Sequence, residues 1–122
     1  MNPLNAFASG DHGVAMNRMS IDKTFEGALQ ATSKGEMLSA MTPVKGSAGY
    51  VALEQVTGSL SGKEGSFVLQ HFGTMSTNSQ RLILEVLSDS GTGDLKGLTG
   101  TMTIDVKDGK HTYTLDYKLP TM

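Results

Sequence analysis

The sequence predicts a single all-β domain, either a sandwich or a barrel, and three observations support this class. Apolar and polar residues alternate along most of the chain, glycine-rich turns recur between the alternating segments, and no segment combines an apolar helical stripe with helix caps. The chain has 122 residues, which suits one domain that buries roughly two-thirds of its unfolded surface.

Taken in chain order, the expected elements are an arm followed by eight strands. Residues 1–13 are polar and carry Gly, Asn and Pro, so we expect a flexible N-terminal arm ahead of a single β-barrel domain over residues 14–122. Eight strands are the smallest number that closes a barrel around side chains or one small ligand. The predicted strands are Val14–Ile21, Thr24–Ala31, Gly35–Thr42, Tyr50–Leu60, Gly65–Thr74, Arg81–Ser88, Gly100–Lys107 and Lys110–Leu119.

An internal similarity assigns the faces of two strands. Residues 58–67 align without gaps to residues 93–102, with three glycines and a leucine at the same spacing. In the segment TMTIDVK the apolar residues are Met102, Ile104 and Val106, so this set faces the core. When the alignment is continued, His71 aligns with Val106. We therefore expect Phe67, Leu69 and His71 to face inward.

Turn chemistry gives the expected pairing across two hairpins. Asp108-Gly109 favours a two-residue type I′ turn, which pairs Val106 with His111. Gly62-Lys63 suits a type II′ turn that places Glu54 opposite His71 on the inward face, with Tyr50 on the same face. A four-residue Ser61–Glu64 loop gives the same pairs, whereas a three-residue loop shifts them by one and spoils the apolar match.

Three stretches of the chain resemble a known family: KTFEGALQATSKGEMLSAMT, GSAGYVALEQVTGSLSGKEGSFVLQHFGTM and SDSGTGDLKGLTGTMTIDVKDGKHTYTLDY. They resemble a bacterial family catalogued as domain of unknown function 3224, over roughly Met19 to Leu119. The most specific block is YVALE…TGSL…GSFVLQHFGTM. The resemblance implies an eight-stranded antiparallel, calycin-like β-barrel similar to that of allene oxide cyclase, with a central cavity. It implies a fold and no activity, and no catalytic residues of the family are carried over.

Polar residues at inward positions of apolar strands are the candidate ligand-binding residues. An inward Glu54–His71 pair could bind a polar ligand head, transfer protons, hold one half of a metal site, or serve as a buried ion pair that fixes the strand register. Tyr50 offers a hydroxyl on the same face. Glu36 is a weaker candidate, because both faces of its strand are largely apolar and it also fits a position at the rim.

Several kinds of site are disfavoured by composition. The chain has no cysteine, which excludes disulfides and zinc–sulfur sites, and its three histidines are dispersed, so we expect no metal and no cofactor. The formal net charge of −2 and the absence of Trp give no support to nucleic-acid binding. No apolar run is long enough to span a membrane, and the N-terminus does not resemble a signal peptide. We expect a cytoplasmic protein.

Three functional hypotheses follow from these features. The first is a binding protein that holds a small, largely apolar ligand in the barrel cavity. The second is an isomerase- or cyclase-type enzyme with His71 as acid/base, oriented by Glu54. The third is a structural barrel without ligand. A homo-oligomer is also expected, because several outward positions are apolar: Val51, Leu53, Val68 and Phe72, with Leu82, Leu84 and Val86 or their alternates Ile83 and Leu87.

Overall fold

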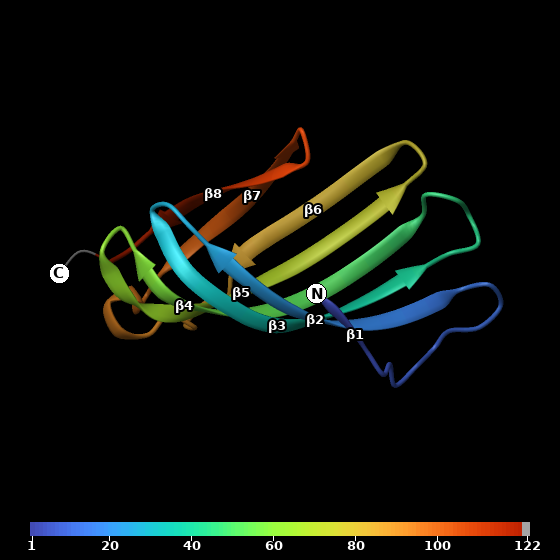
Figure 1. Ribbon diagram of the computed structural model, residues 1–122, viewed down its shortest axis with the longest axis horizontal. Helices are drawn as coiled ribbons and strands as arrows, with labels where there is room; N and C mark the ends of the chain where they lie inside the picture. Colours follow the sequence, from blue (N-terminus) through green and yellow to red (C-terminus); the bar gives the residue numbers. More distant parts are fainter. Residues whose placement is uncertain (121–122) are drawn as a thin grey trace.

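The computed structural model describes residues 1–120, and its strands follow one another across a single curved antiparallel sheet (Figure 1). The predicted all-β class is therefore confirmed. A short 3-10 helix, η1 (Gly93–Leu95), precedes β7. The strands are β1 (Asn2–Leu4), β2 (Ala15–Phe25), β3 (Leu29–Met41), β4 (Ala48–Leu60), β5 (Lys63–Ser76), β6 (Ser79–Val86), β7 (Thr99–Lys107) and β8 (Lys110–Lys118). Among residues 1–120, no helix is long and apolar enough to cross a lipid bilayer.

The sheet is not closed by backbone pairing, so the closed eight-stranded barrel is not confirmed. In the described part of the chain the order runs from β1 to β8 without a pair between these two strands. The first and last long strands approach through side chains instead. The rings of Phe25 on β2 and Tyr113 on β8 meet edge to face with centroids 5.1 Å apart. Farther along β8, the Tyr117 hydroxyl oxygen lies 3.2 Å from that of Ser61, in the turn between β4 and β5.

The strand boundaries near the N-terminus differ from the prediction. The structure has two long strands, β2 and β3, where the sequence predicted Val14–Ile21, Thr24–Ala31 and Gly35–Thr42. Residues 22–23 and 32–34, which separated the predicted strands, continue the alternation of β2 and β3. The chain turns instead at residues 26–28. The short strand β1 lies in the predicted arm and pairs with residues 18–20 of β2. The flexibility of this arm stays a prediction.

One predicted hairpin register is confirmed and the other is corrected. Val106 pairs with His111 across the Asp108-Gly109 turn, as predicted. Between β4 and β5 the turn is formed by residues 61–62, so Glu54 lies opposite Leu69, and His71 lies opposite Ala52. The predicted register is therefore wrong by two residues. A shift of two keeps every side chain on its predicted face, because side chains alternate with a period of two.

The hydrophobic core lies on the inner face of the sheet, defined as the face that carries Phe67 and Leu69. It is most complete at the end where β4 turns into β5, which we call the packed end. The loop containing η1 contributes Leu95 and Leu98, and both are buried. Strand β8 adds Leu115 and Tyr117 to the same core. The inward direction predicted for Phe67, Leu69 and His71 is confirmed, since all three are buried.

The opposite end of the inner face, which we call the open end, has less cover. Strands β6 and β7 pair at only two positions, Leu84 with Met102 and Glu85 with Thr101. Beyond them β6 continues alongside β5, and β7 continues alongside β8. The sheet therefore divides, and the β7–β8 hairpin does not extend the sheet beside β6 at the open end.

The outer face carries part of the predicted apolar patch. Val51, Leu53 and Phe72 are exposed there, as predicted. Leu84 and Val86 are instead buried on the inner face, and the exposed alternate is Leu87. The homo-oligomer inferred from this patch stays a prediction.

Candidate functional site

Four neighbouring strands place a cluster of polar side chains in the middle of the inner face. Lys23 comes from β2, Ser33 from β3, Glu54 from β4 and His71 from β5. Ser33, Glu54 and His71 are buried, and Glu54 is only 1% exposed. Charged side chains are almost never buried without partners, so this cluster needs internal compensation.

Glu54 is the centre of the cluster, and both of its carboxylate oxygens are bonded. Oε1 lies 2.7 Å from Nε2 of His71, and Oε2 accepts a hydrogen bond of 2.5 Å from the Ser33 hydroxyl. Nζ of Lys23 lies 3.5 Å from Oε1. An ionised carboxylate can only accept, so Nε2 of His71 carries the shared hydrogen. The predicted Glu54–His71 pair is therefore present, between diagonal rather than opposite residues of β4 and β5.

The surroundings of Glu54 favour its charged form. Burial by itself raises the pKa of this carboxyl, but hydrogen bonds from His71 and Ser33 and the charge of Lys23 outweigh that effect. The pKa of Glu54 therefore lies below its ordinary value of 4.5. At neutral pH the middle of the inner face holds a buried carboxylate whose charge is compensated by its neighbours.

Tyr50 connects this cluster to the open end. Its ring centroid lies 6.2 Å from that of His71, and its ring lies over Gly73, the residue opposite it on β5. A Cβ atom at position 73 would be 2.3 Å from Cε1 of Tyr50, so the ring can lie there only over glycine. Burial, and then the charge of Glu54, raise the pKa of the Tyr50 hydroxyl. This hydroxyl is therefore protonated at neutral pH.

A groove of ≈ 420 Å³ lies beside Tyr50 at the open end. Its inner-face lining is apolar except for Tyr50, Ser39 and Gln80. Volumes of this order are typical of small-ligand sites in proteins. Glu54 and His71 do not line this groove, since they lie behind Tyr50. The apolar side chains that line it are Met37, Met41, Ala48, Met75 and Leu82.

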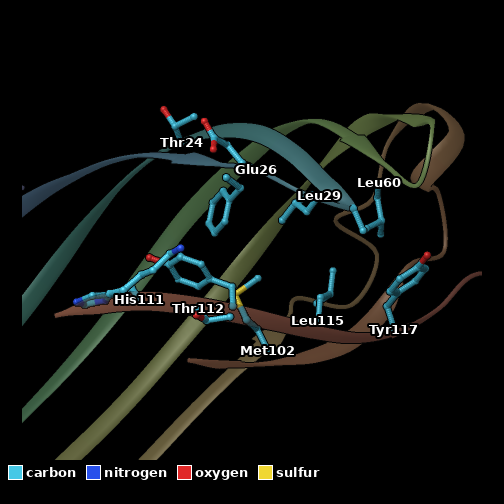
Figure 2. Close-up of a pocket in the computed structure, with 13 residues that line it drawn as sticks. Thr24, Glu26, Leu29, Leu60, Met102, His111, Thr112, Leu115 and Tyr117 are labelled. Atoms are coloured by element: carbon cyan, nitrogen blue, oxygen red, sulfur yellow. The ribbon is translucent and has the colours of Figure 1, made fainter. Parts of the chain in front are cut away.

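A second cavity, of ≈ 470 Å³, occupies the seam between the first and last long strands. Figure 2 shows Glu26 and Leu29 on one side of it, and Leu115 and Tyr117 of β8 on the other. Met102 also lines this seam cavity. None of the four predicted ligand-binding residues does.

Glu36 does not join the cluster. It lies on the outer face, its side chain is 54% exposed, and it forms an ion pair with Arg18 of β2. On β3 the inner positions are odd-numbered, because Ala31 and Ser33 are the buried residues, so position 36 faces outward. Within residues 1–120, no group of three His, Cys, Asp or Glu side chains is placed to hold a metal ion.

Lys23 and Ser33 belong to the site but were not predicted from the sequence. Both fall between predicted strands, in residues 22–23 and 32–34, which were assigned to no strand. The signal was present in the alternation, since Ile21, Lys23 and Phe25 share one face and Ala31 and Ser33 share the same face of the next strand. A polar residue in an otherwise apolar inward series was the criterion that identified His71.

These features define a small all-β protein whose curved sheet holds a buried polar cluster next to an apolar groove. The chain matches the family described as Protein of unknown function (DUF3224) over residues 1–117 and belongs to it. The predicted resemblance is therefore confirmed. No curated protein matches the chain.

A solved structure agrees with this assignment. The crystal structure, at 1.84 Å resolution, of a protein of unknown function from the DUF3224 family of Shewanella oneidensis MR-1 matches with a TM-score of 0.95 and 56% sequence identity. The match covers 99% of this chain and 90% of that chain.

Proposed function

We propose that this protein binds a small, largely apolar molecule in the groove at the open end of its inner face. The observation that carries the proposal is the groove itself, in which apolar side chains surround the accessible face of Tyr50. Met75 and Leu82 are 45% and 48% exposed there, so a ligand would remove apolar surface from water. The likeness to the calycin-like barrel of allene oxide cyclase is part of the same proposal.

In this proposal Tyr50 contacts the ligand, and His71 and Glu54 act behind it. The buried cluster holds four strands at fixed spacing and sets the electrostatic potential at the Tyr50 hydroxyl. His71 and Glu54 are therefore positioning residues, and Glu36 has no part in the site. The enzyme hypothesis gains no specific support, because within the described residues neither Glu54 nor His71 lines the groove.

Methionine methyl groups give a direct test, because they report on the groove and on the seam cavity separately. Met37, Met41 and Met75 line the groove, whereas Met102 lines the seam cavity. We expect an apolar probe such as 2-heptanone to shift the methyl NMR signals of the first three in protein labelled at methionine methyl carbon. The Met102 signal should stay unchanged.

The variant Ala48→Phe fills the groove and should abolish these shifts while the fold is retained, as judged by the dispersed methyl spectrum. Binding that shifts only Met102 would move the ligand to the seam cavity and overturn the proposal. An unchanged spectrum at millimolar probe would overturn it as well.

A further inference from the structure

The side chains of the groove restrict the charge that a ligand can carry. Among residues 1–120, no Asp, Glu or Lys side chain lines the groove, so a cationic ligand would find no carboxylate partner there. Arg81 is the charged residue in the lining, and its guanidinium lies 5.7 Å from the ring centroid of Phe72, which is on the outer face. The inner-face lining is therefore neutral.

Tyr50 both lines the groove and lies beside His71 of the buried cluster, so its hydroxyl is a polar group within reach of a ligand in the groove. It makes no hydrogen bond within residues 1–120, and no buried side-chain oxygen there lacks a partner, so this hydroxyl is accessible to solvent. Because burial and the charge of Glu54 keep it protonated, it is available as a hydrogen-bond donor.

The carboxylate of Glu54 also acts on any ligand atom held at this hydroxyl. The burial that disfavours a phenolate at Tyr50 also disfavours a ligand carboxylate in its place, and the negative charge of Glu54 acts in the same direction as a smaller effect. A neutral carbonyl oxygen accepts the hydrogen bond without this repulsion. The available donor and the burial of Tyr50, with the charge of Glu54 as a smaller contribution, therefore favour the same chemical class of ligand.

We propose that the groove selects an uncharged apolar molecule with one hydrogen-bond acceptor, such as an aliphatic ketone, whose oxygen accepts from the Tyr50 hydroxyl. The inference rests on the proposed function, since it names the ligand class of the same groove. In this inference Tyr50 is the residue that discriminates between a neutral acceptor, an anion and a hydrocarbon of equal shape.

Three probes with the same five-carbon tail separate these cases. 2-Heptanone carries a carbonyl oxygen, 2-methyl-1-heptene replaces this oxygen by a methylene group, and hexanoate replaces the adjacent methyl group by a charged oxygen. Affinities would be measured from the methyl shifts of Met75. We expect the ketone to bind up to about tenfold more tightly than the alkene, the range of one neutral hydrogen bond, and hexanoate to bind more weakly than the ketone.

Two matched variants assign the effect to one hydroxyl. Tyr50→Phe should reduce the affinity for the ketone to that for the alkene and leave the alkene unchanged. Tyr113→Phe removes a hydroxyl from the seam cavity instead and should change neither. Both variants keep the ring, and thermal unfolding would show that both fold.

The outcomes distinguish the two proposals. If the ketone and the alkene bind equally, or if Tyr50→Phe changes nothing, the groove is a ligand site but its proposed selectivity is wrong. If hexanoate binds most tightly, the site selects anions and the inference is overturned. If none of the probes shifts Met37, Met41 or Met75, the proposed function fails, and the selectivity fails with it.

Discussion

The packed end and the open end of the inner face are built from the same strands and are both apolar, yet they differ in exposure. At the packed end Leu60 and Phe67 are each 1% exposed. At the open end Met41 is 58% exposed and Leu82 is 48% exposed. The difference lies in what covers them, because β8 and the η1 loop pack over the first group only. Apolar alternation therefore identifies the inner face but does not decide which part of it is core and which part is available to a ligand.

The largest expected effect is the difference in stability loss when one side chain is truncated at the packed end and one at the open end. Phe67→Ala should reduce the free energy of unfolding by about 3–5 kcal/mol, because it leaves a cavity in a packed core. Met75→Ala should cost less than about 1 kcal/mol, because its side chain is already half exposed. Urea unfolding of both variants measures the contrast. Equal losses would show that the open end is as well packed as the other end and is not a groove.

A smaller effect is expected at the boundary between the two ends. Glu54→Gln should reduce the free energy of unfolding by about 1–3 kcal/mol at neutral pH, because Lys23 and His71 lose a buried charged partner. Glu36→Gln is the matched control, since it removes an exposed carboxylate and should cost no more than about 1 kcal/mol.

The same pair of variants tests the pH dependence. The pKa of Glu54 is lowered in the folded protein, so its contribution is fully present above its ordinary value of 4.5 and is lost as the pH falls through the lower folded-state pKa. In Glu54→Gln this part of the acid destabilisation should disappear, whereas Glu36→Gln should keep it. Parallel pH profiles for the wild type and Glu54→Gln would contradict the assignment.

The smallest expected effect concerns the turn between β4 and β5, which lies at the packed end. Ser61 and Gly62 both have positive φ, of 50° and 84°, as a type I′ turn requires. Ser61→Asn creates the Asn-Gly pair that such turns prefer and should raise the free energy of unfolding by about 0.5 kcal/mol. In the alternative Gly62-Lys63 turn, residue 61 would be a strand residue, where Asn is unfavourable. Because Ser61→Asn also removes the contact with the Tyr117 hydroxyl, the variant is compared in a Tyr117→Phe background, where a loss of stability would favour that register.

The sequence predicted correctly which face of the sheet carries Glu54 and His71, but not which residues of β4 and β5 lie opposite each other. The turn was placed one residue too late, which shifted the predicted register by two, yet Glu54 and His71 still meet because the shift preserved the face. The Asp108-Gly109 hairpin was predicted correctly because this dipeptide specifies its turn strongly. The Ser61-Gly62 turn was not predicted, because Gly62 suits the first central position of a type II′ turn as well as the second central position of a type I′ turn.

Other features depend on contacts that no local pattern contains. Glu36 could not be assigned to a face because apolar residues occupy both faces of its strand, and only pairing with β2 and β4 fixes its direction. The division of the sheet is defined by where the pairing of β6 with β7 ends, at Leu84–Met102 and Glu85–Thr101, and no local pattern marks this point. The groove exists because of this division, so its position also lay outside what the sequence predicts.

The short junction between β6 and β7 has a consequence for how different parts of the protein exchange amide hydrogen with solvent. Beyond Met102, the strands β7 and β8 form a two-stranded ribbon that pairs with nothing else among residues 1–120, and Val106 on it is 63% exposed. An isolated two-stranded hairpin is at most marginally stable in water. Ile104 and Tyr113 still pack against the core, so it is the amides beyond this pair, in residues 105–107 and 110–112, that should open by local unfolding, whereas those of β4 should open only when the whole domain unfolds. Two parts of the sheet, the outer β7–β8 ribbon and the strands around β4, therefore differ in stability, and two residue pairs between β6 and β7 connect them within the sheet.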